Sequence, residues 1–260
     1  MSVFSCCLGE LLGGNVQKKD LMFELSHPAR IGILRLALTK PIRHRDVLQG
    51  SGLAPSEATR HVRRLIGSGV LVKNRDGFFD ITNFGKVVAE RLNIFDFISS
   101  HSSYVERHDF ASIPFGFDVF EMLMKSDKIE GTMKVVNAIL RINAGSKLVL
   151  SCVLDEFNDS LVAVQAEKLR NGIEIHIILS GGKRVPTEYM DSRMMAINVK
   201  AMGEIPFFLF ASETESLICF KSIAGKVDYS MAFHSSEPEF LDWCAALFNY
   251  YWLRGKHVNL

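Results

Sequence analysis

The stretch APSEATRHVRRLIGSGVL, residues 54–71, combines a helical apolar repeat with three arginines and a single acid. Its apolar positions recur at about 100° per residue and share one side of the predicted helix: Ala58, Val62, Leu65 and Ile66. Arg60, Arg63 and Arg64 lie on the other side or flank it. A solvated face usually mixes both signs of charge, whereas this helix is predicted to expose a basic side to a partner.

The flanking segments predict the surroundings of this helix. Ser26 is a candidate N-cap, and Pro28 a first-turn residue, of a helix over 26–40. A shorter helix over 42–52 and the quoted helix follow. Residues 70–82 predict two strands around the turn 74–77, because Asp-Gly is a strong hairpin signal. Residues 83–108 predict a long helix with a break near 99–103. This order predicts a winged helix-turn-helix, with the quoted stretch as its recognition helix.

That position changes how the basic side is interpreted. In isolation, a run of charge indicates only a solvated face, but the third helix of such a domain normally lies in the major groove of DNA. We therefore expect base and phosphate contacts from the helix and the wing: Ser56, Glu57, Thr59, Arg60, Arg63, Arg64, Lys73 and Arg75. His61 is left out of this set, because we expect it to pack against the neighbouring helix.

Charge is distributed unevenly along the 260 residues, although the chain carries a net charge of only +1. Residues 26–92 hold 12 Lys/Arg and 5 Asp/Glu, or 12 − 5 = +7. Residues 93–260 hold 16 and 21, or 16 − 21 = −5. A basic module beside an acidic one is typical of a nucleic-acid reader joined to a second domain. The expected organisation is an N-terminal extension (1–25), a DNA-binding domain with its connecting helix (26–103) and a regulatory domain (104–260).

Composition indicates a cytoplasmic protein with a substantial core, since 48% of the residues are apolar. No apolar run reaches the eighteen or so residues that a membrane span needs, and the N-terminus lacks the features of a secretion signal. The five cysteines form neither a CxxC pair nor a ligand cluster with histidine, so no metal or cofactor is expected. Cys6 and Cys7 are either a redox or metal handle or an unpaired apolar pair.

Beyond residue 104 the pattern changes to that of an α/β domain. Residues 146–154 and 173–179 predict buried strands on either side of a helix over 155–172, and this order suggests a parallel unit. Residues 205–225 predict a strand pair, and residues 238–252 an aromatic helix. The fold class expected for the whole chain is an α+β winged helix-turn-helix domain followed by an α/β effector-type domain.

Residues 26–92 resemble the arsenic-repressor-like winged-helix regulators. The likeness lies in the pattern T-x-H-V-x-x-L-x-x-x-G, in the wing DGFFDIT (76–82) and in Gly85; the pattern residues are Thr59, His61, Val62, Leu65 and Gly69. Metal-sensing members carry a cysteine pair in the recognition region, and none stands here. The resemblance therefore implies the DNA reader and not the metal sensor.

The second half resembles the C-terminal domain of archaeal Fil-type methanogenesis regulators. RHDFASIP (107–114), IPFFLFASETESLICFKS (205–222) and FLDWCAALFNYYW (240–252) carry this likeness. It implies an archaeal transcription regulator with an effector domain. Glu213 and Glu215 stand where an Asp-Glu pair is expected between the two strands, which puts any shared anion or metal chemistry there in doubt.

An effector site in this half is expected around LSGGKR, residues 179–184. Its glycine-rich turn follows a strand and can offer N–H groups to an anion, although the P-loop spacing is missing and a plain strand exit is the alternative. The candidate residues are Ser180, Lys183, Arg184, Tyr189 and Trp243. The aromatic residues of 243–252 are either a pocket lining or core and dimer interface. His176 lacks the lysine of the phospholipase-type H-x-K signature, since Ile178 stands there, and is expected to be structural.

Together these observations predict a homodimeric transcription regulator that binds double-stranded DNA and responds to an unidentified small molecule. A protein-interaction or architectural module without sequence readout is the alternative. No Ser/His/Asp order, H-E-x-x-H motif, paired-carboxylate signature or cofactor fingerprint is present, and the chain is expected not to be an enzyme. An enzyme in the α/β half remains a third possibility, to be judged by whether ionisable groups converge near Ser180–Arg184.

Overall fold

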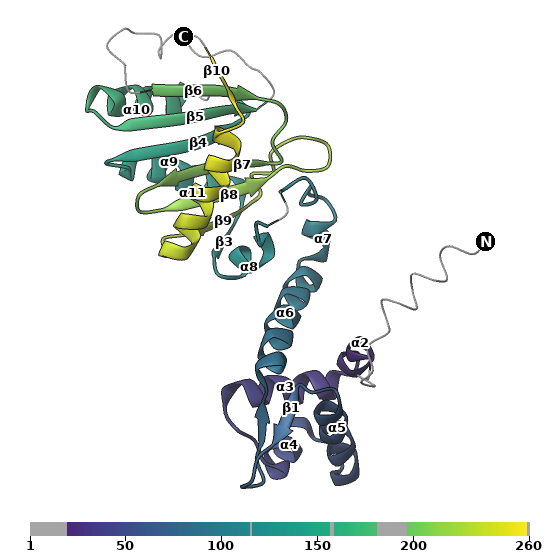
Figure 1. Cartoon of the computed structure of the whole chain (residues 1–260). Helices are drawn as coiled ribbons and strands as arrows, with labels where there is room; N and C mark the ends of the chain where they lie inside the picture. Colours follow the sequence, from purple (N-terminus) through teal and green to yellow (C-terminus); the bar gives the residue numbers. More distant parts are fainter. Residues whose placement is uncertain (1–19, 115, 157–158, 181–196, 259–260) are drawn as a thin grey trace, which may run out of the picture. The chain divides into compact units, whose positions relative to one another are not determined.

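The computed structural model describes residues 20–114, 116–156, 159–180 and 197–258. The chain divides into two compact units, Met1–Phe95 and Asp96–Leu260. The boundary falls inside one long helix, α6 (Asn83–Ser100), which belongs to both units (Figure 1). Among the described residues, no helix combines the length and the apolar character that crossing a membrane requires.

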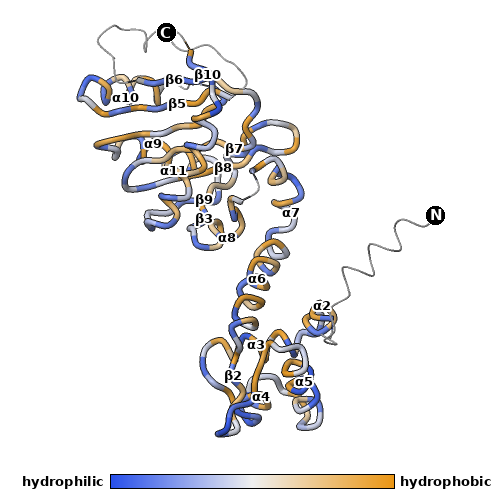
Figure 2. The backbone as a smooth tube through the Cα atoms, viewed as in Figure 1, coloured by the Kyte–Doolittle hydropathy of each residue, from blue (hydrophilic) through white to orange (hydrophobic). Residues whose placement is uncertain are grey.

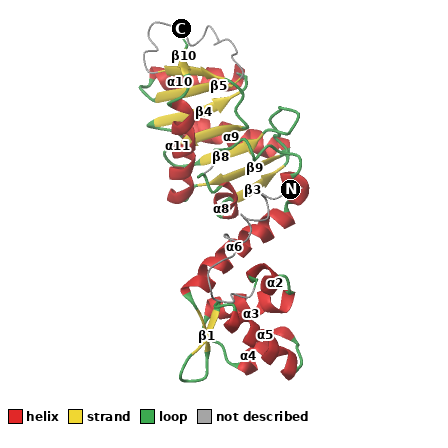
Figure 3. Ribbon diagram, turned by 45° about the vertical axis from the view of Figure 1, so that its right-hand side comes forward, coloured by secondary structure: helices red, strands yellow, loops and turns green. Residues whose placement is uncertain are grey.

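From residue 20 onward, the first unit consists of helices and one small antiparallel hairpin (Figure 3). Its elements before α6 are α2 (Leu21–Leu25), α3 (Pro28–Thr39), α4 (His44–Ser51), α5 (Pro55–Gly67), β1 (Leu71–Lys73) and β2 (Phe79–Ile81). Leu34, Val47 and Leu65 are completely buried where α3, α4 and α5 meet. The predicted order of three helices, hairpin and long helix is confirmed, as is the break after α6, which is followed by the short helix α7 (Ser102–Val105).

Gly85, in the first turn of α6, is required by the packing of this unit. A Cβ atom there would lie 2.2 Å from the carbonyl oxygen of Val70, far inside van der Waals contact. Thr82 strengthens the same junction, because its hydroxyl donates to the carbonyl of Gly69 at 2.7 Å and accepts from the Gly85 N–H at 2.9 Å. The hairpin and α6 are thereby joined to the end of α5.

Two details at the start of this unit differ from the prediction. The N-cap of α3 is His27, whose Nδ1 accepts from the N–H of Ala29 at 3.2 Å, and not Ser26. Ser26 instead closes α2, its hydroxyl donating to the carbonyl of Phe23 at 2.8 Å. Residues 21–25, which were predicted to be part of an N-terminal extension, form a helix capped by Asp20.

The described residues of the second unit form an eight-stranded sheet with the order β10-β6-β5-β4-β7-β8-β9-β3. Its helices after α7 are α8 (Val119–Met124), α9 (Thr132–Gly145), α10 (Asp159–Arg170) and α11 (Pro238–Trp252). Its strands are β3 (Asp127–Glu130), β4 (Val149–Leu154), β5 (Glu174–Ser180), β6 (Ile197–Met202), β7 (Phe207–Ser212), β8 (Ser216–Phe220), β9 (Met231–Ser235) and β10 (Lys256–His257).

The sheet is buried on both faces, which explains why its central strands are apolar without alternation. Along β7, Phe208 and Phe210 point into the core that α9 and α10 cover. Phe207 and Leu209 point into the opposite core, which α8 and α11 cover (Figure 1). Orange and pale colours accordingly dominate these strands in Figure 2. The unit is therefore a helix–sheet–helix sandwich of mixed α and β structure.

The strand directions place the carboxyl ends of several strands at the same edge of the sheet. β4, β5 and β6 are mutually parallel, as the sequence predicted for the first two, and β7 and β8 form the predicted antiparallel pair. Because β7 runs opposite to both β4 and β8, β8 ends at the same edge as β4, β5 and β6. Carboxyl ends of parallel strands are where open α/β sheets place ligands.

Candidate nucleic-acid interface

The helix α5 is fixed by its apolar side and leaves its arginine side outward. Pro55 occupies the first turn, where a missing N–H costs nothing, and the Ala54 N–H donates to the Glu57 carboxylate at 3.4 Å. The side that faces the unit's core is formed by Ala58, His61, Val62 and Leu65, each at most 3% exposed. The opposite side of α5 therefore carries the residues of the helix that are not needed for the core.

Arg60 and Arg63 lie on that remaining side. Both side chains are exposed, and that of Arg60 retains 64% of its accessible surface. The guanidinium of Arg60 lies 3.9 Å from the carboxylate of Glu57, one turn earlier. An exposed pair at this distance contributes little, because solvent screens it. Ser56 and Glu57 are likewise exposed at the N-terminal end of the helix.

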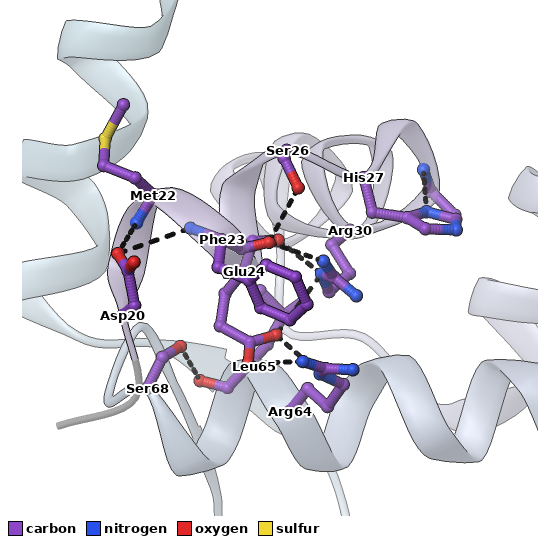
Figure 4. A network of polar contacts seen from close by, with 11 residues as sticks. Asp20, Met22, Phe23, Glu24, Ser26, His27, Arg30, Arg64, Leu65 and Ser68 are labelled. Atoms are coloured by element: carbon purple, nitrogen blue, oxygen red, sulfur yellow. Dashed lines mark hydrogen bonds and ion pairs between the residues drawn. The ribbon is translucent and has the colours of Figure 1, made fainter. Parts of the chain in front are cut away.

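Arg64 is oriented differently, toward the short helix α2 (Figure 4). Its Nε and Nη2 donate to the two carboxylate oxygens of Glu24 at 2.8 Å and 3.0 Å. Glu24 is 1% exposed, and the hydrogen bond from this carboxylate raises the pKa of Arg64. The guanidinium of Arg64 also lies over the ring of Phe23, 4.9 Å from its centroid. Arg64 therefore anchors α2, because its guanidinium pairs with a buried carboxylate, whereas that of Arg60 faces solvent.

A second buried arginine completes this network. Arg30 is 4% exposed, its Nε lies 3.5 Å from the Glu24 carboxylate and donates to the Glu24 carbonyl, and its Nη2 donates to the carbonyl of Phe23 at 2.8 Å. Burial lowers the pKa of Arg30, while Glu24 opposes that effect. One buried carboxylate is thus shared by two arginines from separate helices (Figure 4).

Thr59 and His61 are both occupied inside the unit. The Thr59 hydroxyl donates to the carbonyl of Pro55 at 2.8 Å and contacts Nε2 of His44 at 2.8 Å. His61 is buried against the ring of His27, with 4.4 Å between the ring centroids. It therefore packs inside the unit, which is the reason for which it was left out of the predicted DNA-contacting set. Burial lowers the pKa of His61, and His27, Arg30 and Arg60 add to the effect.

The hairpin presents two further basic residues, Lys73 at the end of β1 and Arg75 in the turn, both exposed. Asn74 shapes this turn, because its side-chain oxygen accepts from the N–H groups of Asp76 at 3.0 Å and Phe78 at 2.9 Å. Gly77 supplies the positive φ of +82° that closes the turn.

Further basic residues lie at the start of α4, outside the set that was predicted to contact DNA. Arg43 and Arg45 are exposed. The guanidinium of Arg43 lies over the ring of Phe78 in the hairpin, 4.1 Å from its centroid, and the neighbouring His44 contacts Thr59 of α5. The start of α4 thus bridges the two predicted basic elements. The sequence RHR, residues 43–45, is the pattern from which this basic position could have been predicted.

In the second unit, only part of the expected effector site lies in the described residues. Lys183, Arg184 and Tyr189 lie outside them, as do Cys6 and Cys7 of the first. Trp243 is half-buried in the core beneath α11, beside Phe240 at 5.7 Å. The other aromatic residues of this helix lie in the same core, and His176 packs edge-on against the ring of Trp252 at 5.3 Å.

The two glutamates in the β7–β8 turn have structural partners. Glu213 accepts from the N–H groups of Lys147 and Val149; burial acts to raise its pKa, but backbone hydrogen bonds outweigh it and lower the pKa. Glu215 pairs with Arg141 and His234, each at 2.9 Å. Among the described residues, no cluster of histidine, cysteine and acidic side chains is suited to a metal ion.

Ionisable groups do converge beside Ser180, the last residue of β5. Its hydroxyl accepts from the ammonium of Lys221 at 3.0 Å. The same ammonium lies 2.6 Å from Asp155 and 3.0 Å from Glu204. These residues come from four separate segments of the sequence, so no local motif predicts that they lie together.

Comparison with known proteins finds similar solved structures at low sequence identity. No family model and no curated protein sequence matches the chain. TrmBL2, described as an archaeal chromatin protein that shows a novel mode of DNA binding, is 10% identical, covering 89% of this chain and 94% of its own, with a TM-score of 0.42. Nuc from Salmonella typhimurium, a phospholipase D family member, is 9% identical over 52% of this chain and 99% of its own, with a TM-score of 0.40. NucT from Helicobacter pylori is 8% identical over 49% and 92%, with a TM-score of 0.40.

The expectation that the chain is not an enzyme is corrected by this comparison. About half of the chain is similar to a phospholipase D family member and to NucT, and the expectation is withdrawn. The expectation rested on the absence of a known catalytic motif from the sequence. Side chains from separate segments can form a site without one, as those around Ser180 illustrate.

Proposed function

We propose that the first unit is a winged helix-turn-helix that binds double-stranded DNA, and that the chain is a dimeric transcription regulator controlled through its second unit. The exposed basic side of α5 carries this proposal. Arg60 and Arg63 are held outward by the burial of the opposite side, and the basic start of α4 and the basic hairpin adjoin the helix. The net charge of +7 over residues 26–92 suits a polyanionic partner.

Each basic element has its own role in this proposal. Arg60 and Arg63 enter the major groove and read base edges, for which the planar guanidinium group is suited. Ser56 and Glu57 lie at the end of the helix that approaches the bases first. Lys73 and Arg75 contact the backbone or the minor groove from the wing, and Arg43 and Arg45 add phosphate contacts.

Arg64 and Thr59 take lesser parts, because their polar groups already have partners inside the unit. Withdrawing Arg64 from Glu24 would leave a buried carboxylate with one fewer cation, at a substantial cost in stability. We therefore assign Arg64 to the attachment of α2 to α5 and not to the contact with DNA.

A second copy of the chain is the proposed partner of α6. A groove of about 410 Å³ lies between α2 and α6, lined by Leu21, Met22, Leu25, Ser26, Val87, Val88, Arg91, Leu92 and Phe95. Met22, Val87 and Phe95 expose 68%, 55% and 60% of their surface, an apolar concentration that a partner would cover. Dimerisation through α6 would double the DNA contacts and place two recognition helices on half-sites about one DNA turn apart.

Selection of random duplex DNA on the full-length protein tests this function. We expect recovery of an inverted repeat whose half-sites are separated by about one helical turn. A single half-site would contradict the dimer but retain the reading function. Recovery of no motif, together with binding to a fixed protein partner, would favour an interaction or architectural module instead.

A further inference from the structure

A cavity with a mixed polar and apolar lining lies at the carboxyl edge of the sheet in the second unit. Its volume is about 450 Å³, within the range of small-molecule pockets. The segment 222–225 and the residues around Glu204 form its walls, and Lys221 lies in its lining. The strands β4, β5 and β6 end at this edge, where open α/β sheets place ligands.

Lys221 is the buried charge of this cavity, with only 4% of its side chain exposed. Its ammonium has three N–H donors and three oxygen partners: Asp155 at 2.6 Å, Ser180 at 3.0 Å and Glu204 at 3.0 Å. Asp155 and Ser180 are 24% and 2% exposed, and Ser180 is further fixed by the N–H of Ile205 at 3.0 Å. Asp155 and Ser180 are therefore held in place by the surrounding fold.

Glu204 differs from the other two partners. Its side chain is 76% exposed, and it follows β6 by two residues, on the cavity wall. An ion pair with one mostly exposed member is weakly held, because water competes for that carboxylate at little cost. Glu204 thus occupies, from the cavity side, a position on Lys221 that another carboxylate could take.

We propose that this cavity binds a small organic carboxylate whose acid group replaces Glu204 on Lys221. The exchange keeps three oxygen partners on the ammonium and leaves the charge beside it unchanged, while Glu204 returns to water. The remainder of the ligand would rest on the apolar part of the lining, which comprises Ile205, Pro206, Ile223 and Ala224.

The other acid of the cavity does not favour a cationic ligand instead. Asp109 lies in the lining, but its two carboxylate oxygens accept from the N–H of Ser112 at 3.0 Å and from the Ser112 hydroxyl. It is already bonded within its own turn. The negative charge of Asp109 repels an incoming anion, so we expect the affinity for a carboxylate to be modest. Asp109 does not create a binding site for an amine, because its oxygens are already hydrogen-bonded.

The cavity wall is continuous with the chain that leaves α6. The N–H of Asp109 donates to the carbonyl of Lys221 at 3.2 Å, and the N–H of Ile223 donates to the carbonyl of Arg107 at 2.9 Å. Residues 107–109 follow α7, which directly follows α6. If the first unit binds DNA as proposed, occupancy of this cavity is the signal that α6 transmits.

Calorimetric titration of the full-length protein, without DNA, tests the site with acetate, succinate and citrate as probes. Glu204→Gln removes the competing carboxylate and should tighten binding of at least one probe roughly threefold to fivefold. Lys221→Met should abolish it. Lys226→Met is the matched control, an exposed lysine on the same turn but outside the cavity lining, and should bind as the wild type does.

Three outcomes would overturn the carboxylate site. These are no binding of any probe to Glu204→Gln, weaker binding by that variant, or binding of 1,4-diaminobutane that Glu204→Gln abolishes. Because Glu204 is exposed, its variant stays informative even if Lys221→Met does not fold. DNA affinity is then measured with and without the tightest probe: a shift supports the signalling role, and no shift contradicts it. Absence of DNA binding under both conditions would refute the proposed function and leave the carboxylate site standing.

Discussion

Arg60 and Arg64 are one turn apart on the same helix, yet the structure gives them different environments. Arg60 faces solvent beside Glu57, whereas Arg64 reaches a carboxylate that is 40 residues away in sequence and fully buried. Helical spacing alone groups the two arginines, since it measures only position on α5. The partner of Arg64 comes from α2, which no periodicity in the quoted stretch reveals.

His61 gives the first unit a dependence on pH. Burial lowers its pKa below the ordinary value near 6.5, so the unfolded chain binds the proton first as the pH falls. The stability associated with neutral His61 is therefore complete above about pH 6.5 and is lost as the pH falls through the lowered pKa of the folded state, at up to about 1.4 kcal/mol per pH unit.

Urea unfolding of the full-length protein between pH 5 and pH 8 checks this prediction. His61→Gln should flatten the decline in the free energy of unfolding below pH 6.5. His257→Gln, in the other unit, serves as the control and should follow the wild type. An unchanged decline in His61→Gln would assign the acid sensitivity to other groups.

At the scale of elements, the short helix α2 owes its place to one buried carboxylate. Glu24→Ala removes the shared acid and leaves Arg30 buried beside a second cation, Arg64. Breaking a buried ion pair in this way costs about 3–5 kcal/mol. The partial exposure of Arg64, 32%, places the expected loss toward the lower end, about 3 kcal/mol.

Chemical denaturation measures this loss, with Glu90→Ala as the control. Glu90 is an exposed acid on α6, and its removal should change the free energy of unfolding by less than about 0.5 kcal/mol. Equal effects of the two substitutions would show that the network in Figure 4 does not hold α2 in place.

Elements with a strong local pattern could be predicted, and those defined by distant partners could not. The helices α3, α5 and α11 and the strands β4, β5, β7 and β8 follow from periodicity and apolar runs. The strands β3 and β10 are short, polar and at the sheet edges, so only pairing defines them. The basic side of α5 lies within one stretch of sequence and could be predicted. The contacts of Lys221 with Asp155, Ser180 and Glu204 join four segments and could not.

For the whole molecule, the proposed function requires DNA binding that depends strongly on salt. If six to eight phosphates are neutralised per dimer, affinity should fall roughly a thousandfold or more between 50 mM and 200 mM salt. Residues 93–260 carry a net negative charge and residues 26–92 a net charge of +7, so we expect the salt dependence to arise mainly from the first unit.

The most direct test is the affinity of full-length protein for duplex DNA, measured by fluorescence anisotropy across that range of salt. Arg60→Glu/Arg63→Glu should abolish binding at every salt concentration while the unfolding transition stays unchanged, because both side chains are exposed. Arg170→Glu/Lys226→Glu makes the same change in net charge in the second unit and should bind as the wild type does. If the first variant binds normally, or if both variants lose affinity equally, the basic side of α5 is only a solvated face and the central claim is contradicted.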